Sequence, residues 1–329
     1  MNAGRPLRLA MLQVGAARKG AEARSMKAEW VDLQINGYGG VDFNAPGLTV
    51  EQVIAVTERL DGDGTAGYLP TIVTGNPETS VETLRVIAEA RRKSARCERN
   101  ILGVHLEGPF ISSEMGAVGT HPIEWVAKPS MDLFGRFQDV CGGIVRLVTV
   151  AAEIEGMPAF VKELSSQGVA VSLGHQMAAT PDDIEPCMAA GAKAFTHLGN
   201  GIPNMIPRHS NIIFTALAED RASVMFIPDG HHLPDTVLKV FTRAVPLKRL
   251  IAVSDAQYPA GMPPGEYEVC GAHARLEPNG LLWNPSRKCL VGATTPMARM
   301  MQLLQVRTGL TMDECLAIGR DNPRALIGV

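Results

Sequence analysis

Short apolar runs alternate with longer amphipathic stretches along this chain, and few folds are compatible with that order. Eight apolar runs follow one another, at 30–36, 67–74, 101–107, 145–153, 169–175, 194–198, 223–229 and 250–255. Between them lie stretches with helical periodicity, such as 49–60, 77–92, 158–167 and 181–190, and several of these begin with Thr or Pro, as helices often do. This alternation is typical of successive βα units on a parallel sheet.

Polar residues at the ends of the apolar runs favour a closed barrel over an open sheet. Periodicity alone is compatible with both a (β/α)8 barrel and a doubly wound sheet. In a barrel the carboxyl ends of all strands meet at one mouth, where barrel enzymes carry their chemistry. We therefore predict an α/β fold, a (β/α)8 TIM-type barrel over residues 30–329. The polar strand-end residues are Gln34, Asn36, Thr71, Thr74, His105, Glu107, Glu153, His175, His197, Asp229 and Asp255.

Two segments lie outside the alternation. Residues 256–291 are rich in Pro and Gly and contain short strand-like pieces, so we expect an excursion over the barrel mouth before helices resume at 295–306 and 311–326. Residues 1–29 contain early arginines and a short apolar stretch that Gln13 and Gly15 interrupt. That pattern favours a poorly ordered leader over an export signal.

Composition excludes several classes of protein. With 46% hydrophobic and 20% charged residues, the chain is able to bury a large core and is not expected to be disordered. Its formal charge of -3 and its lack of a large basic cluster argue against a nucleic-acid partner. No apolar run reaches the ~18 residues of a membrane span, so we expect no membrane association. The six cysteines form no Cys-x-x-Cys pair, which favours reduced thiols and a cytoplasmic protein.

Three strand-end residues form a set suited to a catalytic metal. Glu107, His175 and His197 end strands three, five and six, and one carboxylate with two imidazoles leaves a fourth position on Zn²⁺ for water. A single strand-end histidine is more often a hydrogen-bonded core residue. The convergence of three such residues on one mouth favours the metal site.

Asp255 ends strand eight in VSDA and faces the expected metal across the mouth. A carboxylate in that place can take a proton from water and pass it to a leaving amine. The alternative is a helix N-cap, a position where Asp is common. The neighbouring metal set favours catalysis.

A series of motifs follows in order along the chain. They are VDLQINGYGGVDFN (31–44), GTAGYLPTIVT (64–74), LEGPFIS (106–112), GTHP (119–122), VSLGH (171–175), GAKAFTHLGN (191–200), PDGHH (228–232), VSDA (253–256) and LVGAT (290–294). Together they resemble the landmarks of N-acetylglucosamine-6-phosphate deacetylases of the amidohydrolase superfamily. The resemblance extends from about Trp30 to Val329.

The resemblance implies a role for each matching position. Glu107, His175 and His197 would bind the metal, Asp255 would transfer the proton, and His121 would polarise the acetyl carbonyl. Arg208 would supply the charged fork that phosphate recognition favours. His232 would reach the phosphate from a neighbouring subunit, which implies a homodimer. The positions implied to bind the sugar phosphate are Thr120, His121, Asn200, Gly201, Arg208, His232, Leu290, Val291 and Gly292.

The first strand bears on the number of metal ions. Many amidohydrolases have His-x-His there for a second metal, whereas this chain has Gln34-Ile35-Asn36. Neutral amides are poor metal ligands beside imidazole, so we predict one divalent metal per chain, with Zn²⁺ the expected ion and Fe²⁺ or Co²⁺ as alternatives.

The chain also departs from the family. Gly199 stands where an aromatic residue is usual, and His209-Ser210-Asn211 replaces the usual Glu-Pro-Gly. The small β-sandwich of the family is expected to be largely missing, with residues 1–29 as its possible remnant. The function implied is hydrolysis of the N-acetyl group of an N-acetylhexosamine 6-phosphate in amino sugar catabolism. The alternatives are an amidohydrolase of different amide specificity and a non-catalytic sugar-phosphate-binding relative.

Overall fold

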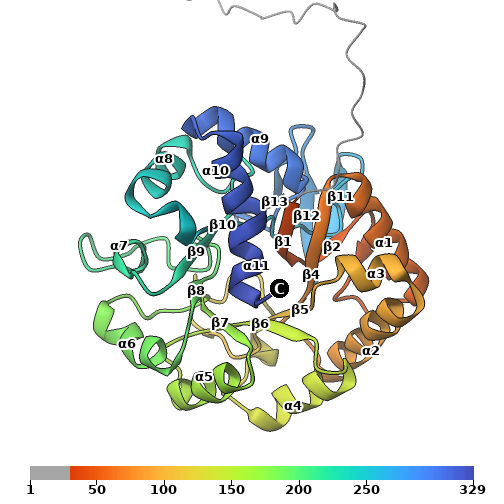
Figure 1. Cartoon of the computed structure of the whole chain (residues 1–329), viewed down its shortest axis with the longest axis horizontal. Helices are drawn as coiled ribbons and strands as arrows, with labels where there is room; N and C mark the ends of the chain where they lie inside the picture. The colour runs from red at the N-terminus through yellow and green to blue at the C-terminus, as the bar shows by residue number, and fades with distance from the viewer. Residues whose placement is uncertain (1–29) are drawn as a thin grey trace, which may run out of the picture.

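A computed structural model describes residues 30–329, and its centre is a ring of eight parallel strands (Figure 1). Neighbours in the ring are also neighbours in the chain order, apart from the small strands inserted after β1. The predicted (β/α)8 barrel is therefore confirmed. The strands are β1 (Trp30–Ile35), β4 (Thr65–Val73), β5 (Val104–Glu107), β6 (Val145–Val150), β7 (Ala170–Leu173), β8 (Ala194–Phe195), β9 (Ser223–Phe226) and β10 (Leu250–Ala252).

The ring closes between β1 and β10 through a short seam. A single bridge pairs Ile35 with Ala256, and the main-chain N–H groups of Asn36 and Gly37 both donate to the carbonyl of Ala256, at 2.8 and 3.2 Å. The other seven strand contacts are ladders of two or more paired residues. The seam is thus the part of the ring with the fewest main-chain hydrogen bonds.

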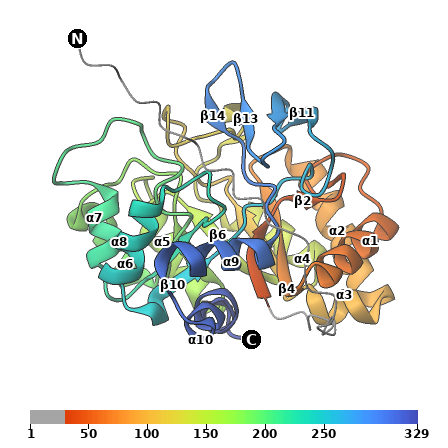
Figure 2. The same cartoon turned by 90° about the horizontal axis from the view of Figure 1, so that it is seen from above.

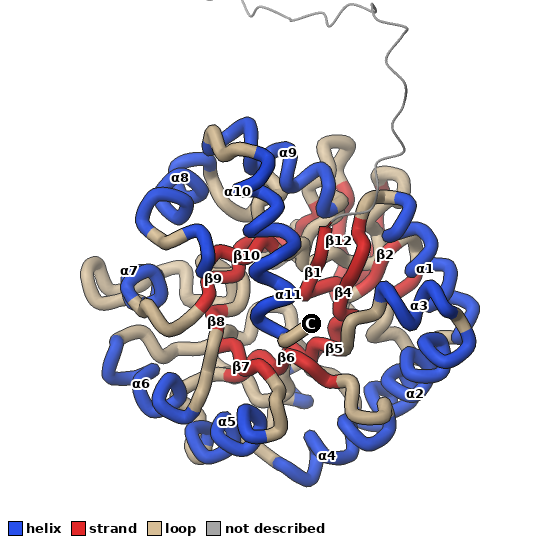
Figure 3. Tube along the Cα trace, in the orientation of Figure 1, coloured by secondary structure: helices blue, strands red, loops and turns tan. Residues whose placement is uncertain are grey.

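Helices surround the ring, as Figure 3 shows in blue around the red strands. Several begin at the residues that the sequence indicates. Thr49 and Thr180 each form a capping box with the side chain three residues later, and Asn76 caps the helix that starts at Pro77. The helices between strands are α1 (Val50–Gly62), α2 (Pro77–Lys93), α3 (Ala95–Asn100), α4 (Met131–Val140), α5 (Met157–Ser166), α6 (Pro181–Ala190), α7 (Ile212–Ala218) and α8 (Asp235–Ala244).

The last helices of the chain lie in two places. α9 (Met297–Thr308) lies beside α8 in the outer ring, whereas α10 (Met312–Leu316), a π-helical turn at Ala317–Asp321 and α11 (Asn322–Ile327) lie over one end of the barrel (Figure 1). The sequence predicts one helix over 311–326, and the structure interrupts it with the π turn. Gly319 lies in that turn, where an added Cβ would stand 2.9 Å from the Trp30 ring, so the small residue lets the helix approach β1 closely.

The segment after β10 folds into a small antiparallel sheet with its own buried cluster, formed by Val269, Ala274, Leu276, Leu282 and Val291. Figure 2 shows this sheet at the end of the barrel opposite α10 and the C terminus. Its strands are β11 (Gly265–Val269), β12 (Ala272–Leu276), β13 (Leu282–Asn284) and β14 (Cys289–Leu290), and a ribbon of β2 (Gly37–Tyr38) and β3 (Val41–Asp42) follows β1.

Two further expectations from the sequence concern a membrane span and residues 1–29. Within residues 30–329 no helix combines the length and apolarity that a membrane span requires. The expected leader at 1–29 lies outside the described residues.

Candidate active site

Four of the predicted site residues lie at the carboxyl ends of strands. Glu107 is the last residue of β5, His175 and His197 follow β7 and β8 by two residues, and Asp255 follows β10 by three. The last three adopt left-handed backbone conformations, with φ of 51°, 26° and 53°. Such conformations are costly for residues other than glycine and persist where the surroundings enforce them, as they often do at functional sites.

Glu107, His175 and His197 come together as the sequence predicts. The Nε2 atoms of His175 and His197 lie 3.2 and 2.9 Å from Oε1 of Glu107, and the two Nε2 atoms are 3.1 Å apart. All three side chains are buried. Among residues 30–329 they are the group whose ligand atoms are placed to hold a metal ion.

Hydrogen bonding fixes the tautomer of His175. Its Nδ1 lies 2.7 Å from the carbonyl of Ala117, which can only accept, so Nδ1 carries the proton. Nε2 of His175 is then the ring atom that faces the cluster, as in metal-binding histidines. Burial disfavours the charged form of Glu107, but hydrogen bonds and positive charge from the two histidines keep its pKa well below the usual range.

Two amide side chains, Gln34 on β1 and Asn36 just after it, hold the carboxylates in place. Nε2 of Gln34 donates to Oε1 of Glu107 at 2.8 Å and to Oδ1 of Asp255 at 3.2 Å, and Nδ2 of Asn36 donates to the same Oδ1 at 2.6 Å. The sequence indicates both residues as polar strand ends and as evidence against a second metal, but it does not predict these contacts. Burial, followed by the charge of Glu107, raises the pKa of Asp255 to about 6.

His121 packs against the cluster. Its ring is 4.4 Å from that of His175 between centroids, and its buried Nδ1 has no hydrogen-bond partner among the described residues. Burial lowers the pKa of His121 to about 3, so the ring is neutral. Gly201 is also close to the His175 ring, because an added Cβ on Gly201 would lie 3.0 Å from Nδ1 of that ring.

Other predicted positions border the same residues. Nδ2 of Asn200 donates to the carbonyl of His197 at 3.1 Å. An added Cβ on Gly292 would lie 2.7 Å from the carbonyl oxygen of Asp255, so Gly292 allows a close approach. Thr120 precedes His121 and is partly exposed. Leu290 is partly buried on β14, and the buried Val291 packs in the small sheet.

Asp229 holds His232 by a hydrogen bond within the chain. The His232 side chain is 4% exposed, and its Nδ1 lies 2.8 Å from Oδ2 of Asp229. An electrostatic interaction with His232 lowers the pKa of Asp255. The role of His232 toward a neighbouring subunit stays a prediction. Arg208 is exposed in the loop between β8 and α7.

A belt of hydrogen bonds inside the barrel, under the ligand cluster, was not predicted. Nε2 of His105 lies 2.8 Å from Oγ1 of Thr149, which lies 2.8 Å from Oγ1 of Thr196, and that hydroxyl donates to Ser172 at 2.7 Å. Nδ1 of His105 lies 3.4 Å from Oγ1 of Thr71. The belt therefore joins five strands one or two residues before the ligands Glu107 and His197. The only sign of it in the sequence is the occurrence of polar residues within apolar runs.

Comparisons with known proteins agree with this geometry, although no family model matches the chain. The human N-acetylglucosamine-6-phosphate deacetylase is 30% identical over 333 residues, which cover 96% of this chain and 78% of that protein. The N-acetylgalactosamine-6-phosphate deacetylase of Escherichia coli O157:H7 is 28% identical over 313 residues, with 94% and 79% covered. A Mycobacterium smegmatis N-acetyl-D-glucosamine-6-phosphate deacetylase, solved in complex with N-acetyl-D-glucosamine-6-phosphate, superposes with a TM-score of 0.83 at 26% identity, covering 96% of this chain and 82% of that one.

Proposed function

Because the chain belongs to the N-acetylglucosamine-6-phosphate deacetylase family, we propose that it hydrolyses the N-acetyl group of an N-acetylhexosamine 6-phosphate to acetate and the amino sugar phosphate. The proposal rests on one observation, that a cluster able to hold a metal and a further carboxylate lie together in one buried site. The cluster of Glu107, His175 and His197 can hold a metal, and Gln34 links that cluster to Asp255.

The chemistry of the donor set fits one divalent ion, and we propose Zn²⁺. His175 and His197 both turn Nε2 toward Oε1 of Glu107, so one carboxylate and two imidazoles converge. A metal bound there would polarise the acetyl carbonyl and lower the pKa of water. The amides of Gln34 and Asn36 present N–H groups to carboxylates, which supports a single ion.

Asp255 is the proposed proton carrier. Gln34 and Asn36 both donate to its Oδ1, which leaves Oδ2 to accept a proton from the attacking water. The same carboxyl then returns the proton to the departing amine. His121, kept neutral by burial, is placed beside His175 to donate a ring N–H to the acetyl oxygen as negative charge develops.

The remaining predicted positions form the proposed substrate site. Gly201, Asn200 and Gly292 border His175, His197 and Asp255, so a sugar can approach the reacting groups along main chain with little side-chain bulk. His232 lies in the same chain as this site, and its ring stands near Asp255. Arg208, exposed in the loop after β8, is proposed to bind the 6-phosphate. Thr120, Leu290 and Val291 complete the site.

We also propose a cytoplasmic homodimer. The cysteines are all unpaired within the described residues, which supports a reducing compartment. Apolar side chains are exposed in loops at the barrel mouth, with Met115 91%, Met205 90% and Ile123 58% exposed. The loops of Met115 and Met205 meet, because an added Cβ on Gly116 would lie 2.8 Å from Pro203. Exposed apolar surface of this kind is typical of a protein interface.

An activity panel tests the proposed reaction. Purified protein would be assayed for acetate release from N-acetylglucosamine and N-acetylgalactosamine, each with and without a 6-phosphate, and from N-acetylated amino acids. We expect acetate to be released from the phosphorylated sugars in preference to the other compounds. Preference for an amino-acid amide would overturn the proposed substrate, and inertness toward every compound in metal-loaded protein would overturn the proposed reaction.

A further inference from the structure

We infer that Asp32, a buried residue of β1, is a positioning residue for Asp255. This inference rests on the proposed function, because it concerns the residue that would carry the proton. Asp32 is 1% exposed and belongs to the seam between β1 and β10.

One oxygen of Asp32 holds main-chain groups on both sides of the seam. Oδ1 accepts the N–H of Ser254 at 3.0 Å and the N–H of Gln34 at 3.2 Å. Ser254 precedes Asp255 in the chain, and the side chain of Gln34 contacts both Glu107 and Asp255. A single carboxylate therefore ties together the two segments that carry the proposed proton carrier and its amide donor.

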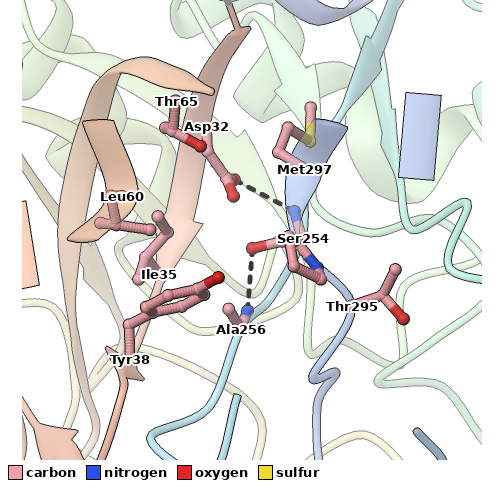
Figure 4. Close-up of a pocket in the computed structure, with 10 residues that line it drawn as sticks. Asp32, Ile35, Tyr38, Leu60, Thr65, Ser254, Ala256, Thr295 and Met297 are labelled. Carbon is pink, nitrogen blue, oxygen red and sulfur yellow. Dashed lines mark hydrogen bonds between the residues drawn. The ribbon is translucent and has the colours of Figure 1, made fainter. Parts of the chain in front are cut away.

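The hydroxyl of Ser254 completes the arrangement on the other side of Asp255. Ser254 Oγ accepts the N–H of Ala256 at 3.0 Å (Figure 4). The same hydroxyl donates to the carbonyl of Gln34 at 3.2 Å. The N–H before Asp255 is held by Asp32, and the N–H after it is held by Ser254. The carbonyl of Asp255 itself accepts from Ala293 at 2.9 Å.

These contacts allow a backbone conformation at Asp255 that regular pairing of two strands would not allow. Asp255 adopts φ of 53°, a conformation that a non-glycine residue keeps only where its surroundings enforce it. A continuous main-chain ladder would hold residue 255 extended. Side-chain oxygens of Asp32 and Ser254 accept the N–H groups of residues 254 and 256. Residue 255 is therefore free to turn its carboxyl toward the amides of the first strand segment.

The surroundings of Asp32 support the view that side chains hold the seam between β1 and β10 together. A cavity of about 10 Å³ lies beside it, lined on the β1 side by Tyr38 and Thr65 and on the opposite side by Ser254 and Met297 (Figure 4). Burial raises the pKa of Asp32 to about 6, so the fold keeps a carboxyl where its charge is disfavoured. An apolar residue would fill this place without that cost, but it would leave two main-chain N–H groups without an acceptor.

The test compares Asp32→Ala, Asp32→Asn and Ser254→Ala, measured as kcat and KM for acetate release from N-acetylglucosamine 6-phosphate, with metal content and thermal melts recorded. Asp32→Ala should lower kcat by about 10²-fold, as a misplaced catalytic group does, with little change in KM and one metal still bound per chain. Asp32→Asn should lose much less, because an amide oxygen accepts the same two N–H groups. Ser254→Ala should also lower kcat, since it frees the N–H of Ala256.

A matched control separates positioning from stability. Leu84→Ala removes a fully buried side chain from α2, away from the site, and should lower the melting temperature without lowering kcat at an assay temperature well below the melt. The inference is overturned if Asp32→Asn is as slow as Asp32→Ala, if Asp32→Ala keeps its kcat, or if the control loses as much. If Asp32→Ala fails to fold, Ser254→Ala tests the inference in its place. An unchanged kcat in Ser254→Ala overturns the inference. Inactive wild-type protein would instead refute the proposed function.

Discussion

Replacing Asn36 with Ala should shift the pH dependence of catalysis toward higher pH. Nδ2 of Asn36 donates to Oδ1 of Asp255 at 2.6 Å, and this contact lowers the pKa of a carboxyl that burial raises to about 6. Only the ionised form of Asp255 can accept a proton, so activity falls as the pH drops through its pKa. Loss of the donor disfavours the ionised form and raises that pKa.

The size of the shift follows from the hydrogen bond that is lost. A hydrogen bond to a charged group contributes about 1.5 to 3 kcal/mol, and one pKa unit corresponds to about 1.4 kcal/mol. Gln34 still donates to the same oxygen at 3.2 Å and compensates in part. We therefore expect the acid limb of kcat/KM to move up by about one pH unit.

The assay is a pH profile of kcat/KM for acetate release, with Asn100→Ala as the control. Asn100 is also a buried asparagine that donates to a carboxylate, at 3.2 Å to Oδ1 of Asp61, but it lies on α3 away from the site. Its profile should match that of wild type. An acid limb that stays in place in Asn36→Ala, or moves to lower pH, would refute the proposed role of Asn36 and weaken that of Asp255.

Three further predictions concern chemistry, recognition and folding. Asp255→Asn should lower kcat by about 10²-fold or more in steady-state assays, because an amide cannot carry the proton, and a change below tenfold would remove Asp255 from proton transfer. Arg208→Ala should act mainly on KM for the phosphorylated sugar and cost about 1.5 to 3 kcal/mol in kcat/KM, and equal loss with the unphosphorylated sugar would make Arg208 structural. His105 is buried with its pKa lowered from 6.5 to about 4, so the unfolded chain binds a proton that the folded chain does not. Above pH 6.5 the ring is neutral in both the folded and the unfolded chain, so stability is complete there. The free energy of unfolding should fall by up to about 3 kcal/mol as the pH drops toward 4. Urea titrations of metal-free protein should show a smaller fall in His105→Gln, and equal falls would contradict the neutral buried ring.

The barrel and the cluster of three candidate metal ligands could be predicted because local patterns determine them. Each strand is a short apolar run, and the polar residue at its carboxyl end must face the mouth, so Glu107, His175 and His197 could be placed together without knowledge of any contact. Helix starts such as Thr49 and Pro77 could be predicted for the same reason, since helix starts depend on neighbours in the chain.

Contacts between distant segments could not be predicted in this way. Asp32 meets Ser254 across 222 positions of the chain, and Gln34 meets Glu107 across 73. Nothing in an apolar run shows which partner a buried amide or carboxyl will find. His232 illustrates the same limit, because its contact with the Asp229 carboxylate depends on the loop conformation.

A metal titration followed by acetate release tests the central claim most directly. Metal-free protein would receive increasing amounts of Zn²⁺ in the presence of N-acetylglucosamine 6-phosphate, while the release of acetate and the bound metal are both measured. We predict negligible release without metal and a linear rise that ends at about one ion per chain, the occupancy expected for three converging ligands. Full activity in metal-free protein, a rise that continues to two ions, or one bound ion without any release would contradict the account.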